Sequence, residues 1–302
     1  MVPAKSSVEG FSELVARFQP EGPCQLPVHT SEIWDALIYP SFLGKEVRSA
    51  QAAYLSDLLM GHLDYTERGA ATSDTKWGAT VQADIDAERR IVPAGSFGAR
   101  FKRPALASAE KLLRSGDLAN MVSTADSFFR RHRITPTLVA SIAPYRSRQM
   151  DLVTAAATDI AHFGPVKAVL WLHDFGLGQD FAPPNLHIRH FLREQGFSDA
   201  SLDDDADGMH ALSVVCQRAR EVASLVGRDV GRIVSARLCQ HAAWLWETCR
   251  GLLASHHKAS RLTVRRLLKF LDSREWTPET LADEVGNIER IEIIEQDLAS
   301  FV

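Results

Sequence analysis

Apolar residues recur at three- and four-residue steps through most of the chain beyond residue 104, and this spacing constrains the fold more than any other feature. It is the spacing of an α-helix that turns one face toward a core. Strand-like alternation is poor, and residues 91–98, with a proline and two glycines, are typical of a loop. The sequence therefore predicts an all-α, mainly helical fold. The first apolar stripe consists of Met150, Val153, Ala157 and Ile160, and others follow at 211–226, 238–246 and 281–294.

Length and hydropathy bound the class of protein. With 302 residues and 45% hydrophobic content, the chain is long enough for one large domain or two intimate ones. Its first residues lack the apolar segment of a secretory signal, and no uncharged apolar run approaches the roughly 20 residues that cross a bilayer. We therefore expect a cytoplasmic protein with no membrane partner.

The cysteines are scattered along the chain without a Cys-x-x-Cys pair. A disulfide frame, an iron–sulfur cluster or a structural zinc site would need closer or paired thiols. The spacing indicates reduced core thiols, and we expect no metal ion and no cofactor. Trp171, between two leucines, is likewise predicted in the core. The cysteines are Cys24, Cys216, Cys239 and Cys249.

Charge is distributed unevenly, although the formal net charge is only −4. Residues 89–149 carry twelve Lys and Arg against three carboxylates, a local charge of +9. Residues 272–297 carry nine carboxylates against two arginines. Such asymmetry is typical of a face that binds a polyanion, but a solvated helical surface has the same pattern. Charge alone leaves both interpretations open.

Three motifs within residues 142–197 carry the chemistry. The central one is a tight turn with a glycine just before a helix, and it follows an amphipathic helical stretch. Such a turn presents backbone N–H groups at the positive end of a helix, where a phosphate can bind without the base sequence being read. The motifs are Ile142-Ala143-Pro144-Tyr145-Arg146-Ser147-Arg148, His162-Phe163-Gly164-Pro165-Val166-Lys167-Ala168, and Pro183-Pro184-Asn185-Leu186-His187-Ile188-Arg189.

In order and kind, these motifs resemble those of the helix-hairpin-helix DNA glycosylase superfamily, over about 56 residues. The resemblance implies a two-lobed, all-α architecture with a cleft between the lobes. It also implies an enzyme that flips a modified base out of double-stranded DNA and excises it, in base-excision repair or in defence against phage DNA with hypermodified bases. Because a single continuous basic face suffices for one duplex, we expect a monomer. We accordingly expect an N-terminal lobe over residues 1–104, a glycosylase-like domain over 105–253 and a C-terminal extension over 254–302.

Three positions depart from the family pattern. His162 stands where the first glycine of the hairpin is expected. Val166 stands where lyase-competent members carry a lysine nucleophile, and Lys167 is the next residue. Asn185 stands at the position of the catalytic aspartate of the family. These changes leave the implied fold intact but leave open which residue drives catalysis.

Cleavage of an N-glycosidic bond develops positive charge on the sugar, which a nearby carboxylate stabilises. Asparagine has no such charge, so three accounts stay open. In the first, Asn185 is only a helix N-cap and the enzyme is inactive. In the second, Asn185 lies in the pocket while Asp180 or Asp174 supplies the charge, although Asp174 could also simply brace its helix end. In the third, Lys167 attacks the sugar carbon as an amine.

The resemblance also implies a set of residues that face DNA. Tyr145, Arg146 and Arg148 fit a DNA-facing loop, because the basic segment ends there. His187 and Arg189 would face the flipped nucleotide or a phosphate, or else form an exposed face and a satisfied core imidazole. The predicted DNA contacts are Tyr145, Arg146, Arg148, His162, Gly164, Pro165, His187 and Arg189.

Two other functions remain alternatives. The stretch 170–176 contains a His173-Asp174 pair that looks like the motif of His-Asp metal-dependent phosphohydrolases. Those enzymes need further metal ligands, one of which His132 or His162 could supply. The other alternative is a non-catalytic DNA-binding module that uses the hairpin alone. Such a module would bind duplex DNA with steep salt dependence and leave no abasic product.

Overall fold

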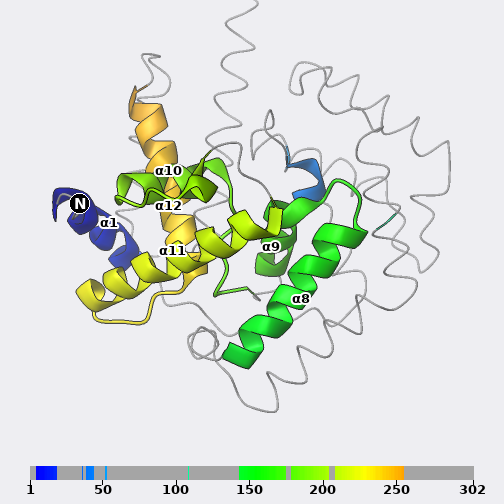
Figure 1. The fold of residues 1–302 in the computed structure, drawn as a ribbon. Coiled ribbons are helices and arrows are strands. Elements are labelled where there is room, and N and C mark those ends of the chain that lie inside the picture. The colour runs from blue at the N-terminus through cyan, green and yellow to red at the C-terminus, as the bar shows by residue number, and fades with distance from the viewer. Residues whose placement is uncertain are drawn as a thin grey trace, which may run out of the picture.

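The computed structural model describes residues 5–18, 36, 39–43, 52, 108, 143–174, 178–203 and 208–254. The elements are α1 (Lys5–Arg17), α8 (Ala143–Asp159), α9 (Gly164–Asp174), α10 (Leu186–Glu194), the short 3-10 helix η1 (Ala200–Leu202), α11 (Gly208–Val230) and α12 (Ala236–Ala254) (Figure 1). Within these ranges there are helices and connecting turns but no strand, which agrees with the all-α prediction. None of these helices combines the length and the low polarity that a membrane crossing requires. The boundary predicted at residue 104 lies outside the described residues. The described residues end at Ala254, so the boundary predicted at 253 also stays a prediction.

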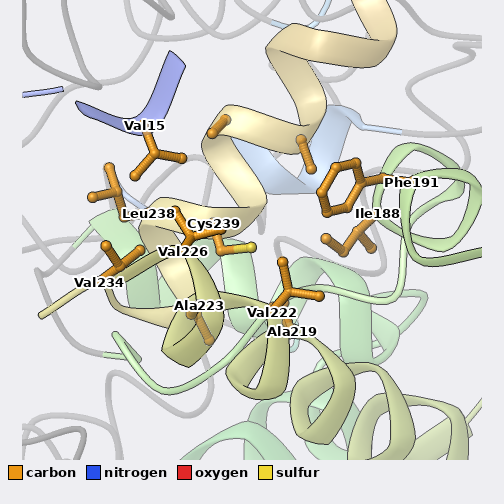
Figure 2. Close-up of a cluster of buried hydrophobic side chains, with 14 of the residues drawn as sticks. Val15, Ile188, Phe191, Ala219, Val222, Ala223, Val226, Val234, Leu238 and Cys239 are labelled. Carbon is orange, nitrogen blue, oxygen red and sulfur yellow. The ribbon is translucent and has the colours of Figure 1, made fainter. Parts of the chain in front are cut away.

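Among the described residues, a group of buried apolar side chains lies between α1, α10, α11 and α12 (Figure 2). We call it the apolar cluster; its members include Phe11, Val15, Ile188, Phe191 and Val226, each at most 1% exposed. The ring centroids of Phe11 and Phe191 are 4.3 Å apart, so α1 contacts α10 directly. Burying an aromatic or aliphatic side chain of this size stabilises the fold by about 1.5–3 kcal/mol. The first helix of the chain therefore closes a core that is otherwise formed by its last described helices.

The turn between α11 and α12 is fixed by two local features. A Cβ at Gly227 would lie 2.7 Å from the carbonyl oxygen of Arg232, so the chain can turn back this closely only at a glycine. The Ser235 hydroxyl accepts a hydrogen bond of 2.9 Å from the Leu238 amide and so caps the start of α12. As a result, α12 leaves the turn packed against α11.

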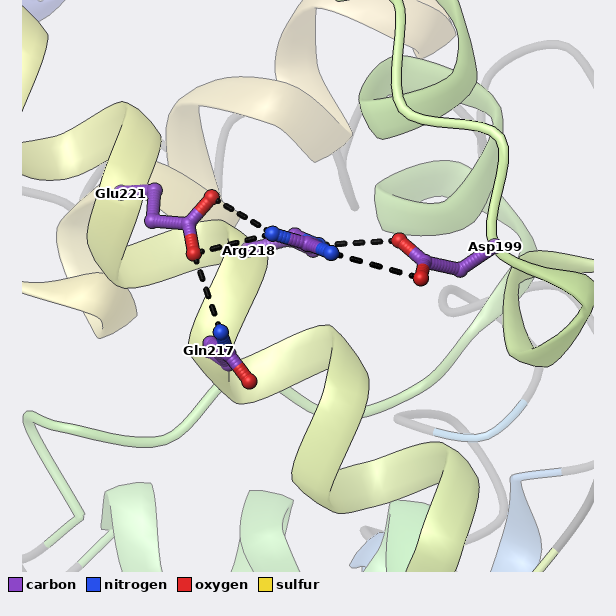
Figure 3. A network of polar contacts seen from close by, with 4 residues as sticks. All are labelled: Asp199, Gln217, Arg218 and Glu221. Carbon is purple, nitrogen blue, oxygen red and sulfur yellow. Dashed lines mark hydrogen bonds and ion pairs between the residues drawn. The ribbon is translucent and has the colours of Figure 1, made fainter.

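An ion-pair network ties α11 to the segment before η1 (Figure 3). The Arg218 guanidinium lies between two carboxylates, with nitrogen–oxygen distances of 2.9 Å to both Asp199 and Glu221. It also lies over the Phe197 ring, 5.2 Å from the centroid. All three charged side chains keep contact with solvent, so each pair contributes at most about 1 kcal/mol. The network orients the connection more than it stabilises the core.

α8 and α9 pack against each other as a helical hairpin (Figure 1). Val153 and Ile160 of the predicted apolar stripe are buried, whereas Met150 and Ala157 are only half-buried. Gln149 is 1% exposed and takes the buried position next to Met150. The core-facing stripe of α8 is therefore displaced from the predicted one at this end.

The predicted core positions of Trp171, Cys216 and Cys239 are confirmed. Trp171 is 1% exposed, and both cysteines are buried free thiols. Burial raises the pKa of the Cys239 thiol to about 12, so it stays protonated and unreactive at neutral pH. The Cys24 position and the Cys249 side chain lie outside the described part of the chain.

Candidate functional site

The turn that joins α8 to α9 is the first element of the candidate site. The Phe163 amide donates a hydrogen bond of 3.1 Å to the Ile160 carbonyl, which closes a β-turn over these four residues. His162, the third residue of the turn, has a φ of 60°, and Gly164 has a φ of 57°. Histidine is among the few non-glycine residues enriched in this left-handed conformation. The hairpin is therefore built with a histidine at the position where the resemblance implies its first glycine.

The N-terminus of α9 follows directly from this turn. Pro165 stands in the first turn of the helix, where its missing amide hydrogen removes no helical hydrogen bond. A Cβ placed at Gly164 would meet no atom within 4 Å, so space is open beside the helix start. His162 next to it is exposed. A positive helix end with open space beside it is suited to binding a phosphate.

Tyr145, Arg146 and Arg148 lie in the first two turns of α8. The prediction that they form a loop is wrong, because the helix already begins at Ala143, with Pro144 in the first turn that proline tolerates. The structure describes the backbone of Tyr145, Arg146 and Arg148, so their contact with DNA stays a prediction.

Lys167 is half-buried on α9, and its Nζ donates a hydrogen bond of 3.2 Å to the carbonyl oxygen of Ser41. Ser41 itself is 1% exposed. This contact ties α9 to residues 39–43, and Lys167 would have to leave it to attack a sugar carbon. Val166, at the lysine position of the family, is half-buried beside it.

Asn185 ends a buried segment that runs from residue 178 and connects α9 to α10. It is the N-cap of α10: its backbone is extended, and its Oδ1 accepts a hydrogen bond of 3.1 Å from the Ile188 amide. The side chain is half-exposed. The expected N-cap is thus confirmed, whereas the inactivity that the first account joins to it stays a prediction. The cap leaves the Nδ2 donor for another acceptor. A contact with a nucleotide stays a prediction.

The two candidate carboxylates differ in their access to solvent. Asp180 is 1% exposed, and the Arg220 guanidinium lies 3.9 Å from its Oδ2 and donates to its carbonyl oxygen. Asp174, the last residue of α9, is exposed. The protein around Asp174 nevertheless desolvates it enough to raise the pKa of its carboxyl, and the charge of Arg237 opposes this rise.

His187 and Arg189 lie on the first turn of α10 but are placed differently. Arg189 is 3% exposed and donates a hydrogen bond to the Asp203 carbonyl. This placement does not fit the predicted contact with DNA, because the guanidinium instead ties α10 to the end of η1. His187 is half-buried; burial, and then the neighbouring His190, lower its pKa. Its imidazole is therefore expected to be neutral at pH 7 and to bring no charge to a phosphate.

A group of polar side chains between α9 and α12 was not predicted from the sequence. We call His173, Asp174, Arg237 and His241 the polar cluster. The rings of His173 and His241 lie 5.9 Å apart, and the Arg237 charge acts on both imidazoles and on Asp174. Burial, followed by Arg237, lowers the pKa of His173 well below its usual value and that of His241 to about 3. The sequence feature that could have indicated this group is the four-residue spacing of Arg237 and His241, which places both residues on one face of a helix.

The His173-Asp174 pair does not take the arrangement of a metal site. His173 is 3% exposed, and its Nε2 lies 3.2 Å from the Gly178 carbonyl oxygen and 3.1 Å from that of Phe181. Carbonyl oxygens only accept, so Nε2 carries the ring proton and is not a ligand. Within the described ranges, no three His, Cys, Asp or Glu residues are grouped as a metal ion requires, and His132 lies outside them. The geometry of His173 thus gives the phosphohydrolase alternative no support.

The hairpin turn, the Asn185 cap and half of the polar cluster lie within one stretch, residues 160–185, and α12 adds the other two residues of the cluster. Comparisons with protein-family models, with curated proteins and with solved structures find no match to this chain.

Proposed function

We propose that this protein is a DNA glycosylase, which flips a modified base out of duplex DNA and hydrolyses its N-glycosidic bond. The observation that carries the proposal is the pair of left-handed residues, His162 and Gly164, at the start of α9. Two left-handed positions, separated by one residue, are what a Gly-x-Gly turn accommodates most easily. The backbone of the turn therefore supports the family resemblance at the position where the sequence departs from it.

The hairpin would hold DNA through its backbone. Amides at the N-terminus of α9 would bind a phosphate of the strand that carries the target base. The open space beside Gly164 and the exposure of His162 support this role. The basic stretch 89–149, which ends on α8, would add salt-dependent affinity for any duplex.

Asp174 is the residue that we assign to stabilise the developing charge on the sugar. Its support is access: Asp174 is exposed, whereas Asp180 is buried against Arg220. This role needs the ionised carboxyl, which the charge of Arg237 favours and the desolvation of Asp174 opposes. Lys167 is the weaker candidate, because its ammonium already bonds to the Ser41 carbonyl.

Asn185 would orient the nucleotide rather than supply charge. Its Nδ2 would donate to an oxygen of the sugar or base while Oδ1 keeps the cap. The Asn185→Asp variant retains a good N-cap and adds the carboxylate of the family. We expect it to release base at least as fast as the natural protein, and Asn185→Ala to release base more slowly.

Base release from defined duplexes tests the proposal. Duplexes that carry oxidised, alkylated, deaminated or phage-type hypermodified bases are incubated with the full chain. Free base is detected by mass, and abasic sites are detected as alkali-labile breaks. We expect one class of substrate to yield both products. Salt-dependent binding to every duplex with no free base from any of them would contradict the proposal and favour a non-catalytic DNA-binding module.

A covalent trap separates the carboxylate route from the amine route. Attack by Lys167 would form an imine with the sugar aldehyde, which borohydride reduces to a stable protein–DNA adduct. We expect no such adduct, since Asp174 is assigned to the reaction. An adduct that disappears in Lys167→Ala would instead assign the chemistry to Lys167.

A further inference from the structure

A single buried imidazole bonds to both ends of the turn that follows α9. The Phe181 amide donates a hydrogen bond of 2.9 Å to the Gly178 carbonyl, which closes a β-turn over residues 178–181. The Nε2–H of His173 reaches the same Gly178 carbonyl at 3.2 Å and the Phe181 carbonyl at 3.1 Å. One side chain of α9 therefore holds the first and the last carbonyl of this turn.

The turn fits closely around the ring of His173. Gly178 has a φ of 73°, and a Cβ there would lie 3.2 Å from Cδ2 of His173. The other ring nitrogen, Nδ1, is buried and has no hydrogen-bond partner among the residues that the structure describes. A buried nitrogen without a partner costs stability, so packing alone does not account for a histidine here. Its two hydrogen bonds to the turn do account for it.

From the turn, the chain runs to Asn185 with little freedom. Ala182 is fully buried, and its amide and carbonyl lie 3.4 Å and 3.5 Å from the Cys216 sulfur. Pro183 and Pro184 come next, and each ring fixes its own φ. The Asn185 amide then donates to the Pro183 carbonyl at 2.7 Å. A displacement of the turn is therefore passed on to the N-cap of α10.

We propose that His173 is a positioning residue, which clamps the turn at 178–181 and thereby holds Asn185 where it meets the flipped nucleotide. This inference rests on the proposed function, because Asn185 has a reactive partner only if DNA is the substrate. His173 itself touches neither base nor sugar. It acts through the carbonyls of the turn.

Kinetics with matched variants test the positioning role. His173→Leu removes both hydrogen bonds to the turn. His173→Gln provides an N–H donor again, at similar reach. Val226→Ala is the control, because it weakens the apolar cluster away from the turn. We expect His173→Leu to lower kcat for base release about 100-fold with KM for the duplex almost unchanged, the effect of a small displacement of a reacting group. His173→Gln should recover most of this loss, and Val226→Ala should keep the kcat of the natural protein. A natural kcat in His173→Leu overturns the proposal.

Hydrogen exchange measures the same displacement without DNA. The Phe181 amide reports the turn, and the Ile188 amide reports the Asn185 cap. We expect both amides to exchange at least about tenfold faster in His173→Leu than in the natural protein, and more than other amides do. In Val226→Ala, exchange at these two amides should not be selectively faster. Unchanged exchange at both amides overturns the positioning of Asn185 by His173. If the natural protein releases no base, the proposed function fails, and these two amides still decide whether His173 holds the cap.

Discussion

α12 contributes to the apolar cluster and to the polar cluster, and the two are built in opposite ways. Toward α1, α10 and α11 it buries Leu238 and Ala242, both at most 2% exposed, among other apolar side chains. Toward α9 it presents Arg237 and His241 to the buried ring of His173. The first contact removes hydrocarbon from water. The second buries two imidazole nitrogens, His173 Nδ1 and His241 Nε2, for which the described part of the chain provides no hydrogen-bond partner.

This difference indicates which region stabilises the protein and which one serves its function. Burial of hydrocarbon is favourable, whereas burial of a polar atom without a partner is unfavourable. Proteins retain such unfavourable groups mainly where function requires them. We therefore expect substitutions in the apolar cluster to change stability most, and substitutions in the polar cluster to change activity more than stability.

Truncation of Phe191 should have the largest effect on stability. Phe191→Ala removes a fully buried ring that contacts Phe11, and a cavity of this kind costs about 3–5 kcal/mol. Denaturant unfolding measures the loss. Leu186→Ala on the same helix, where the side chain is 42% exposed, should change stability by less than about 1 kcal/mol. Equal losses in the two variants would show that the apolar cluster does not carry the stability.

The pH dependence of unfolding should reveal the two buried imidazoles. Burial lowers the pKa of both His173 and His241, so below about pH 6.5 the unfolded chain takes up protons that the folded protein does not. Their contribution is complete above pH 6.5. As the pH falls from 6.5 toward 4, His241, with a pKa of about 3 in the folded protein, loses about 1.4 kcal/mol per pH unit, and His173 changes the stability in the same direction.

The effect is measured as a difference between variants, because Asp174, with its raised pKa, acts in the opposite direction. His241→Leu should reduce the slope of unfolding free energy against pH by about 1.4 kcal/mol per unit. Leu225→Ala, at an exposed position of α11 and without a change in any titratable group, should leave the slope unchanged. A His241→Leu protein with the natural slope would contradict the burial of this imidazole.

Replacement of Gln149 should stabilise the protein. Both polar atoms of its side chain are buried and have no hydrogen-bond partner within the described ranges. Gln149→Leu therefore removes an unfavourable burial and should raise the unfolding free energy by about 1–3 kcal/mol. Gln217→Leu, on the exposed face of α11, should change it by less than about 0.5 kcal/mol. A destabilised Gln149→Leu protein would mean that the α8 side is packed as tightly as the apolar cluster.

The smallest effect on the unfolding free energy is expected at Asn185, the N-cap of α10. Asn185→Ala removes the bond to the Ile188 amide and should lower the unfolding free energy by about 1 kcal/mol. Asn185→Asp should keep nearly all of it, because aspartate caps as well as asparagine. Thermal unfolding of the two variants makes the comparison, and equal melting temperatures would argue against the cap.

Much of the fold could be predicted because helical periodicity is a local property. The stripe expected over residues 211–226 is buried on α11, for example at Val215 and Val226. On α8, burial of Gln149 in place of Met150 could not be predicted, because it contradicts the hydropathy of the two residues. Packing against the rest of the chain determined it.

The candidate site divides in the same way. The Asn185 cap was predictable, because N-cap preference depends on residues within one turn. The buried position of Arg189 was not predictable, since its guanidinium donates to the carbonyl oxygen of Asp203, which lies beyond the end of its own helix. The role of His173 depends on a turn that folds back onto it and on His241 from α12, which adjacency in sequence could not reveal.

The central claim is that an exposed carboxylate on the hairpin helix excises a base, and the most direct measurement compares free base released by the natural protein and by Asp174→Asn from the same modified duplexes. We predict that mass spectrometry detects a released base with the natural protein and at least about 100-fold less with Asp174→Asn, while both unfold at similar denaturant concentrations. Equal release by the two proteins, or no free base from any duplex, would contradict the account.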